Sequence, residues 1–397
     1  MKKWLLFLCL LQGMDILYAQ QTNDYFPPRG SWKKQSPVKS GFDTAKLNVA
    51  IRFAIKNESK NPRSMELSQK MSFGKEPFGE AIGPFADRGD PTGLIIHKGY
   101  IVAEWGEPSR VDMVHSVSKS FLSTVIGVAI DSDKISLDEN MGTRVWAVQL
   151  YDTANPGADP VFIYPFNGEH NGKIWWETML RQTSDWEGTL WGKPDWADRP
   201  DRDSTKWHNR KRNKPGDIWE YNDVRVNVLA LAATVMWRKS LPEVLKKYIM
   251  DPIGASTTWK WHGYKNSWIS LDGKPVQVVS GGGHWGGGMF MNAYDMARFG
   301  LLTLNRGNWN GKQLISKHWI NQSLIPTEAN PSYGFMNYFV NRDKKYLPSA
   351  PETSFAHVGN GTNVIYVDTR HELVIVMRWI ESSAVDGMVK RVLDALK

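Results

Sequence analysis

The spacing of apolar residues follows two periods along this chain, and the strand-like period is clearest near the two ends. Residues 94–96 and 100–105 are apolar runs separated by His97-Lys98-Gly99, and residues 363–367 and 373–377 flank a polar turn, so each pair predicts a β-hairpin. Apolar residues at helical spacing predict helices over about 44–55, 116–130, 224–237, 293–304 and 385–396. The chain is therefore expected to be α+β. One antiparallel sheet would be built from N- and C-terminal strands, flanked by helices, with a mostly helical middle region.

The first nineteen residues have the pattern of a signal peptide. Lys2 and Lys3 precede the apolar run 4–11, which is too short to span a bilayer, and Ala19 ends a small-residue cleavage site. The alternative is an uncleaved N-terminal anchor. We expect residues 1–19 to be removed, residues 20–40 to form a polar arm, and residues 41–397 to fold as one unit with a helical and loop subregion over about 132–290. The chain would then be exported, periplasmic or secreted, with no membrane span after cleavage.

Composition narrows the chemistry. The single cysteine, Cys9, lies in the predicted signal peptide, which excludes a disulfide framework, a Cys-rich zinc site and an iron–sulfur cluster. The net charge of +8 suits anionic partners, but no basic helix suggests nucleic acid. The sequence contains neither the G-x-S-x-G nor the H-E-x-x-H motif, and it has no phosphate-binding loop. The glycine-rich run Gly281–Gly288 lacks the lysine that such a loop requires, so it predicts a cramped turn instead. We expect neither a metal nor a cofactor.

The pattern Ser-x-x-Lys occurs four times, and its surroundings distinguish the copies. Three copies, starting at Ser31, Ser36 and Ser72, lie in the polar arm or in a Gly-containing loop. Only Ser116-Val117-Ser118-Lys119 opens a long apolar helix after a strand pair, where a spacing of three places both side chains on one face. There a lysine can take the serine proton, and backbone N–H groups at the helix start can stabilise an oxyanion. The alternative is a helix start with a surface lysine.

Two further segments are candidates for the same site. Tyr221 follows a Pro-Gly turn just before an apolar helix, where its hydroxyl could relay a proton, although a packed aromatic is the plainer interpretation. His357-Val358-Gly359-Asn360 precedes a strand of the second hairpin, and a glycine beside a strand edge lets a ligand approach the backbone closely.

Taken in order, Ser116-Val117-Ser118-Lys119, Tyr221-Asn222-Asp223 and His357-Val358-Gly359 resemble the serine beta-lactamase and penicillin-binding superfamily. The similarity is greatest to the class C-like branch with its carboxylesterases, D-aminopeptidases and nylon-oligomer hydrolases, and runs from about residue 85 to the C-terminus. The resemblance implies that Ser116 is the acylated nucleophile and that Lys119 is its general base. It implies that Tyr221 protonates the leaving group and activates water.

The same resemblance assigns the rest of the site. The N–H groups of Ser116 and Asn360 would form the oxyanion hole, while His357 and Gly359 would line the substrate groove. The segment Leu180-Arg181-Gln182-Thr183-Ser184 is similar to the branch's "L-x-H-T-S" box.

Departures from the family pattern bear on the substrate. His357 stands where beta-lactamases usually carry lysine, Asp223 replaces an asparagine, Gln182 replaces a histidine, and Asp185 replaces a glycine. A largely neutral histidine attracts a drug's carboxylate less than a lysine does. We therefore expect an exported serine hydrolase of small or oligomeric ester or amide substrates, with carboxylesterase-like activity favoured over true beta-lactamase activity. The alternative is a catalytically silent protein of the same fold that binds a polysaccharide or peptidoglycan. The oligomeric state is left open.

Tryptophans are concentrated in the middle of the chain. Twelve of the nineteen lie between residues 175 and 285, and we expect Trp186, Trp191 and Trp285 to form an aromatic wall for a bulky acyl or sugar group. The alternative is that they pack a loop-rich region. The basic run from Lys206 to Lys214 predicts a solvated loop, with a role in attracting anionic substrates left open.

Overall fold

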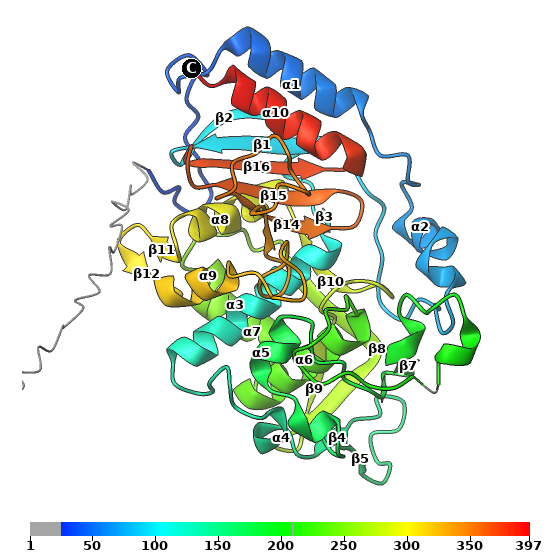
Figure 1. Ribbon diagram of the computed structural model, residues 1–397. Coiled ribbons are helices and arrows are strands. Elements are labelled where there is room, and N and C mark those ends of the chain that lie inside the picture. Colours follow the sequence, from blue (N-terminus) through cyan, green and yellow to red (C-terminus); the bar gives the residue numbers. More distant parts are fainter. Residues whose placement is uncertain (1–24, 209) are drawn as a thin grey trace, which may run out of the picture.

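The computed structural model describes residues 25–208 and 210–397. Its main sheet joins the two ends of the chain, as the hairpins predicted: six antiparallel strands lie in the order β13-β14-β15-β16-β1-β2 (Figure 1). The N-terminal strands join the C-terminal ones where β1 pairs with β16, with Ile95 opposite Ile375. The strands are β1 (Thr92–His97), β2 (Tyr100–Trp105), β13 (Phe339–Val340), β14 (Phe355–Gly359), β15 (Asn363–Asp368) and β16 (Leu373–Arg378).

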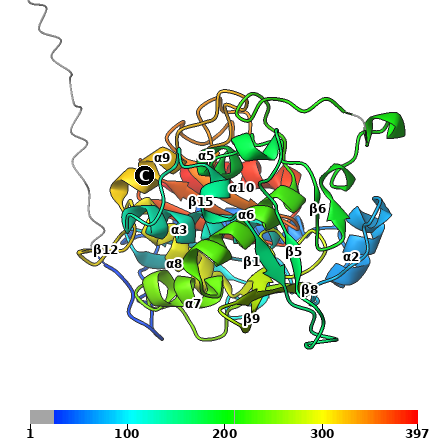
Figure 2. The same cartoon turned by 90° about the horizontal axis from the view of Figure 1, so that it is seen from below.

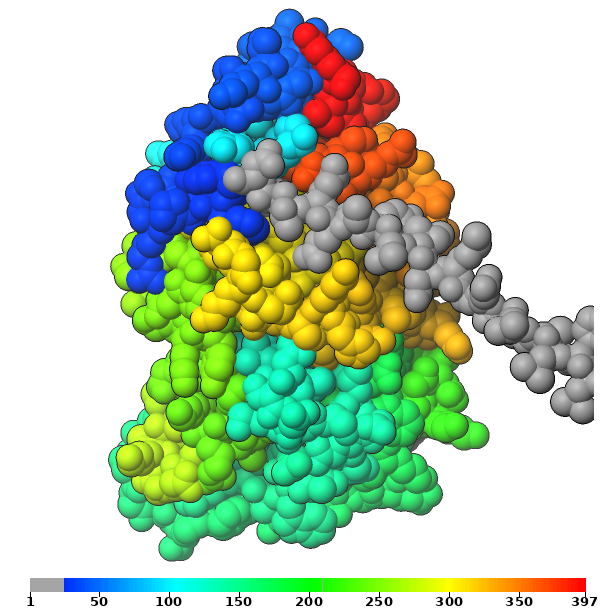
Figure 3. All heavy atoms as spheres, turned by 90° about the vertical axis from the view of Figure 1, so that its left-hand side faces the viewer, coloured from blue at the N-terminus to red at the C-terminus, as the bar shows by residue number. Residues whose placement is uncertain are grey.

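Helices cover both faces of this sheet because its central strands are apolar on both sides. Ile95 and Ile375 pack beneath α1 (Thr44–Lys56) and α10 (Val385–Ala395), which lie side by side at the top of the molecule in Figures 1 and 3. Alternate residues such as Leu94 and Val374 face α8 (Ala293–Leu304) and α3 (Ser118–Asp131). The α+β class with a sheet built from both ends is therefore confirmed.

The middle of the chain contains a second antiparallel sheet that the apolar spacing did not predict. Its order is β3-β10-β8-β4-β5, with β9 paired to β8. The long strand β8 is rich in polar and aromatic residues, so it lacks the apolar alternation of the first sheet. The strands are β3 (Asp112–Met113), β4 (Val148–Leu150), β5 (Val161–Ile163), β8 (Lys260–Leu271), β9 (Lys274–Val279) and β10 (Gly288–Met291).

Helices and short turns fill the space around this second sheet, as Figure 2 shows from below. The α-helices are α4 (Met141–Arg144), α5 (Trp176–Leu180), α6 (Asp223–Trp237) and α7 (Leu241–Leu245), followed by the π-helix η6 (Lys246–Met250). Short strands and 3₁₀ turns near them are β6 (Thr189–Leu190), β7 (Lys193–Pro194), η3 (Asn171–Lys173), η4 (Asp195–Ala197) and η5 (Ser204–Lys206). The remaining elements are α2 (Met65–Met71), η1 (Phe73–Lys75), η2 (His115–Val117), α9 (Lys317–Ser323), β11 (Asn308–Trp309), β12 (Lys312–Gln313) and η7 (Ser382–Ala384).

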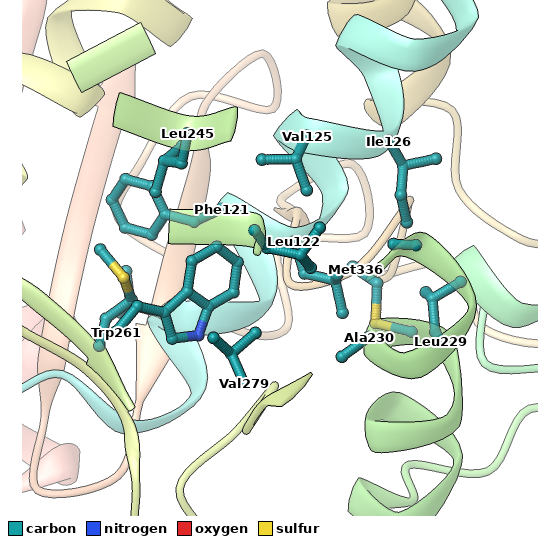
Figure 4. Close-up of a cluster of buried hydrophobic side chains, with 14 of the residues drawn as sticks. Phe121, Leu122, Val125, Ile126, Leu229, Ala230, Leu245, Trp261, Val279 and Met336 are labelled. Atoms are coloured by element: carbon teal, nitrogen blue, oxygen red, sulfur yellow. The ribbon is translucent and has the colours of Figure 1, made fainter. Parts of the chain in front are cut away.

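Helix α3 is the central element that carries the Ser-x-x-Lys segment. Phe121, Leu122, Val125 and Ile126 are completely buried, and Figure 4 shows them packed against α6, α7 and the second sheet. A helix that is apolar on nearly every side must lie inside a protein. The start of α3 is therefore held rigidly between the two sheets.

The predicted signal peptide, the cleavage site after Ala19, Cys9 and the first residues of the arm lie outside the described residues. Where the arm is described, Trp32 donates its indole N–H to the Gly99 carbonyl and packs near the Arg298 guanidinium. Within the described residues, no helix has the length and apolarity needed to cross a membrane.

Candidate active site

Ser116 and Lys119 meet at the start of the buried helix, as their spacing predicted. The Lys119 Nζ lies 2.9 Å from the Ser116 Oγ, and the lysine side chain is completely buried while Ser116 is partly exposed. Ser116 lies in η2, directly after His115, whose φ of 47° is in the left-handed region that most residues avoid. This backbone turns the Ser116 hydroxyl toward Lys119 at the junction of the two sheets.

Tyr221 and Asp223 complete the inner part of this group. The Tyr221 hydroxyl lies near the Ser116 side chain, and the Tyr221 ring lies 4.9 Å from the Lys119 Nζ. Burial and then the Asp223 charge raise the pKa of Tyr221, so the phenol keeps its proton. The Asp223 Oδ1 lies 2.5 Å from the Lys119 Nζ. The structure thus brings Ser116, Lys119, Tyr221 and Asp223 together.

The loop that carries Tyr221 is fastened by Gln182 of the "L-x-H-T-S"-like segment. The buried Gln182 accepts a hydrogen bond from the Asn222 N–H at 2.8 Å and donates one to the Tyr333 hydroxyl at 2.9 Å. The backbone carbonyl of Gln182 also accepts a hydrogen bond from the backbone N–H of Glu220. A glutamine can therefore fix the position of Tyr221 where relatives carry histidine.

The Gly-rich run is cramped, as expected, and it presses on the Lys119–Asp223 pair. A Cβ on Gly282 would lie 2.3 Å from the Lys119 Nζ and 2.4 Å from the Asp223 Oδ1. Gly283, Gly286 and Gly287 all have positive φ, which only glycine adopts readily. Gly282 thus approaches the ion pair so closely that its position has no room for a side chain.

Sequence reasoning missed three residues that contact Asp223 and a fourth that lies behind one of them. The Arg199 guanidinium donates twice to the Asp223 Oδ2 at 3.1 Å, and the His284 Nδ1 lies 3.2 Å from the same oxygen. Asp198 accepts the backbone N–H of Asp223, and Glu76 contacts the outer nitrogen of His284 at 2.9 Å. These residues come from segments far apart in the sequence, and only the glycines around His284 gave any signal of the site.

Glu76, Asp198 and His284 hold ligand-type atoms within 4.8 Å of one another. Both nitrogens of His284 are already matched to carboxylate oxygens, and Asp198 pairs with Arg199 at 2.6 Å. The charges of these groups are thus balanced by the protein itself, and ion pairing accounts for their arrangement without a metal.

The third predicted segment reaches the site through its backbone. A Cβ on Gly359 would lie 2.1 Å from the Val114 carbonyl oxygen and 3.3 Å from the Ser116 backbone nitrogen. Asn360 follows at the end of β14 and is exposed. Gly359 thus brings the end of β14 against the backbone of Ser116.

His357 does not line an accessible groove, which corrects its predicted placement. Its side chain is completely buried, and its ring packs 4.6 Å from that of Tyr338 and 5.2 Å from that of Phe299. Side chains alternate along a strand, and this position faces the core beneath the sheet. Burial lowers the pKa of His357 to about 3, so the imidazole is neutral.

Because His357 is buried and neutral, we expect the free energy of unfolding to decrease in acid. The pKa of His357 in the folded protein lies below its ordinary value of 6.5, so the unfolded chain binds a proton that the folded chain refuses. The stability that the neutral form of His357 contributes to the folded protein is fully present above pH 6.5, and it decreases as the pH falls toward about 3. We expect His357→Phe to reduce the drop in the free energy of unfolding between pH 7.5 and 4.5 by about 2 kcal/mol. Urea titrations at both values measure it.

The exposed His318 offers a matched control for that measurement. His318→Phe should leave the difference between the two pH values unchanged. An equal acid loss in wild type and His357→Phe would show that other groups, such as the buried His115 with its lowered pKa, control acid unfolding.

The tryptophans expected to form an aromatic wall are structural. Trp186, Trp191 and Trp285 are buried in the main hydrophobic core, and the Trp186 indole donates to the Pro165 carbonyl at 2.6 Å. The prediction that they face a substrate is therefore wrong, because a loop-rich region without disulfides uses these large rings for packing.

The arginines of the basic run are tied to the protein, whereas Lys206, Lys211 and Lys214 are exposed, in agreement with a solvated loop; Asn209 lies outside the described residues. Arg212 contacts Asp195 at 2.6 Å, and Arg210 binds Asp185. The buried Arg225 joins both acids, at 2.8 Å from Asp185 and 3.3 Å from Asp195. The Asp185 that replaces a family glycine thus anchors this run beside the Tyr221 loop.

Comparisons with known proteins agree with this arrangement. The family model described as Beta-lactamase matches residues 94–382. Among solved structures, the beta-lactamase/D-alanine carboxypeptidase from Pseudomonas syringae is similar with a TM-score of 0.55 and 12% identity, over 89% of this chain and 99% of that one. EstCE1, a hydrolase with promiscuous acyltransferase activity, matches with a TM-score of 0.54 and 12% identity, over 89% of this chain and 98% of that one.

A putative 6-aminohexanoate-dimer hydrolase from Bacillus anthracis is similar with a TM-score of 0.52 and 16% identity, over 94% of this chain and 87% of that one. At these identities the structures establish the shared fold, while the family model covers most of the chain and contains all three motif segments. The chain, with Ser116 and Lys119 in contact at the start of its central helix, belongs to the beta-lactamase family of serine hydrolases.

Proposed function

We propose that this protein hydrolyses an ester or amide bond through an acyl-enzyme on Ser116, with carboxylesterase-like activity favoured over true beta-lactamase activity. The observation that carries the proposal is the 2.9 Å contact between the Ser116 Oγ and the Nζ of the completely buried Lys119. A silent binding protein would have no need to hold a buried lysine against a partly exposed serine.

In acylation, the Ser116 Oγ bonds to the substrate's carbonyl carbon as its proton passes to the Lys119 Nζ. The developing oxyanion would accept hydrogen bonds from the backbone N–H groups of Ser116 and Asn360, which Gly359 brings together. Tyr221 keeps its proton and contacts Ser116, so it can donate that proton to the leaving alcohol or amine and recover it from Lys119. Water then attacks the acyl carbon, and its proton passes through the Tyr221 hydroxyl to Lys119. The bond between the acyl carbon and the Ser116 Oγ breaks, Lys119 returns that proton to the Ser116 Oγ, and the carboxylic acid leaves.

The environment of His357 favours ester and amide substrates over beta-lactam drugs, which carry a carboxylate that a cation in the site would bind. Its neutral ring is buried behind β14, so it offers a substrate no positive charge. The Arg199 guanidinium, which lies 4.9 Å from the Tyr221 ring, is paired with Asp198 and Asp223. Two of the similar structures are named as a hydrolase with promiscuous acyltransferase activity and a putative 6-aminohexanoate-dimer hydrolase, which agrees with the hydrolase activity proposed here.

The test combines turnover with labelling. We expect hydrolysis of short-chain p-nitrophenyl esters and a fluorophosphonate adduct on the Ser116 peptide by mass spectrometry. Ser116→Ala should remove both, whereas Ser36→Ala, in the exposed Ser-x-x-Lys copy of the arm, should change neither. Labelling that survives in Ser116→Ala would overturn the nucleophile, and faster hydrolysis of a cephalosporin than of any ester would overturn the ester preference.

We also infer that the protein is exported, on the signal-peptide pattern of residues 1–19. N-terminal sequencing of the protein recovered outside the cytoplasm should begin at Gln20. A retained N-terminal segment would support the uncleaved anchor instead.

A further inference from the structure

A chain of close polar contacts continues from the candidate nucleophile into the protein and ends near its surface. It runs from Ser116 through Lys119 to the Asp223 Oδ1, and from the Asp223 Oδ2 through His284 to Glu76. The contacts are 2.9, 2.5, 3.2 and 2.9 Å long. The proposed reaction requires only the first of these contacts, so the outer part of the chain needs an explanation of its own.

His284 has a carboxylate oxygen at each ring nitrogen. Its Nε2 faces Glu76, and its Nδ1 lies 3.3 Å from Asp198 and 3.2 Å from Asp223. A neutral imidazole carries one nitrogen that can only accept a hydrogen bond, and that nitrogen would oppose a carboxylate oxygen. Both contacts are satisfied only if both nitrogens carry protons. The geometry therefore holds His284 as an imidazolium, and its raised pKa of about 9 agrees, since the neighbouring acids outweigh the burial that opposes the charge.

The two oxygens of Asp223 face different cations. Oδ1 faces Lys119, while Oδ2 faces Arg199 and His284. A carboxylate beside Lys119 stabilises its ammonium form, which cannot accept a proton from Ser116. Cations on the far oxygen weaken that effect by drawing on the same negative charge. His284 and Arg199 thus reduce the stabilisation that the Asp223 carboxylate gives to the ammonium form of Lys119.

The charged groups around His284 come from several elements. Those facing or adjoining it are Glu76 after η1, Asp198 and Arg199 after η4, Asp223 on α6, Lys119 on α3 and His115 in η2. With His284 charged and His115 neutral, the three cations balance the three carboxylates.

We propose that Glu76 and His284 are positioning residues that keep a buried imidazolium against Asp223, and that this charge sets the pH range in which Lys119 can accept the Ser116 proton. The inference rests on the proposed function of Ser116 and Lys119. It assigns a role to the segment of residues 72–80, where the Phe73 ring packs against the His284 ring with 4.2 Å between the ring centroids. This segment lies outside the family match at residues 94–382 and would control the chemistry from there.

The decisive measurement is the pH dependence of fluorophosphonate labelling at Ser116. In His284→Gln the Asp223 charge is less opposed, so the acid limb of the labelling rate should move to higher pH by about one unit. In Asp223→Asn the carboxylate is lost, so the same limb should move to lower pH. A purely structural role would lower the rate in both variants without moving the two limbs in opposite directions.

A second readout does not depend on activity. Histidine labelled with ¹⁵N should show His284 with two protonated nitrogens at pH 7.5, and Glu76→Gln should make that signal titrate at lower pH. Glu80→Gln is the matched control, since it removes an exposed carboxylate from the same segment without contacting His284.

The outcomes separate the two proposals. No labelling of the wild-type protein would refute the serine hydrolase itself. Two results would refute only the role of Glu76 and His284 and leave the serine hydrolase proposal intact. One is normal labelling of the wild type with no change in the acid limb of the pH profile in either variant, and the other is a neutral His284 at pH 7.5. Labelling or activity that is lost on chelation and restored by zinc would also refute it, because the group would then be a metal site.

Discussion

Replacing Lys119 by methionine should lower the rate of Ser116 acylation by a factor of about 10² to 10⁴, the range that a general base contributes. Methionine matches the length and flexibility of the lysine stem and removes the amine that lies 2.9 Å from the Ser116 Oγ. The Asp223 carboxylate would keep Arg199 and His284 as partners, so the variant should remain folded. Burst-phase kinetics with a p-nitrophenyl ester, together with the labelling rate, measure the loss.

The control for this variant comes from the arm. Lys39→Met changes the exposed lysine of the Ser36 copy of Ser-x-x-Lys and should leave acylation at the wild-type rate. If Lys119→Met kept more than a tenth of the acylation rate while folding normally, Lys119 would not be the base. Tyr221 would then be the remaining group in contact with Ser116.

The inner part of the site was predictable because its residues occupy local positions. Ser116 and Lys119 lie within one helical turn, and the apolar residues that follow show that this turn opens a buried helix. The same pattern at Ser36 is followed by Pro37 and polar residues, so the surroundings distinguished the copies. Tyr221 could be placed for a similar reason, since it directly precedes the apolar helix α6.

The outer part of the site could not be predicted, because it depends on contacts between distant segments. Glu76, Asp198 and His284 are separated by more than eighty residues at each step, and none lies in a periodic pattern that would indicate its neighbours. The tryptophans failed for a related reason. Their number predicted an aromatic function, but whether a ring faces solvent or core depends on tertiary packing. Trp285 is completely buried although it adjoins His284.

Gly359→Ala should damage both folding and chemistry. The added Cβ would lie 2.1 Å from the Val114 carbonyl oxygen, and both groups belong to backbone that is fixed by the sheets. β14 must therefore shift, at a cost of about 1–3 kcal/mol in the free energy of unfolding, as for other overpacked sites. The shift would also carry the Asn360 N–H away from Ser116. Loss of one oxyanion donor lowers kcat by about 10²- to 10³-fold.

Urea unfolding and ester turnover on the same preparation separate the two effects. Gly157→Ala is the matched control, because its Cβ would meet no atom within 4 Å in an exposed loop. That variant should match the wild type in stability and rate. A folded Gly359→Ala protein that turned over the ester at the wild-type rate would show that the Asn360 N–H does not bind the oxyanion. The developing charge would then have to be stabilised by the Ser116 N–H and the start of α3.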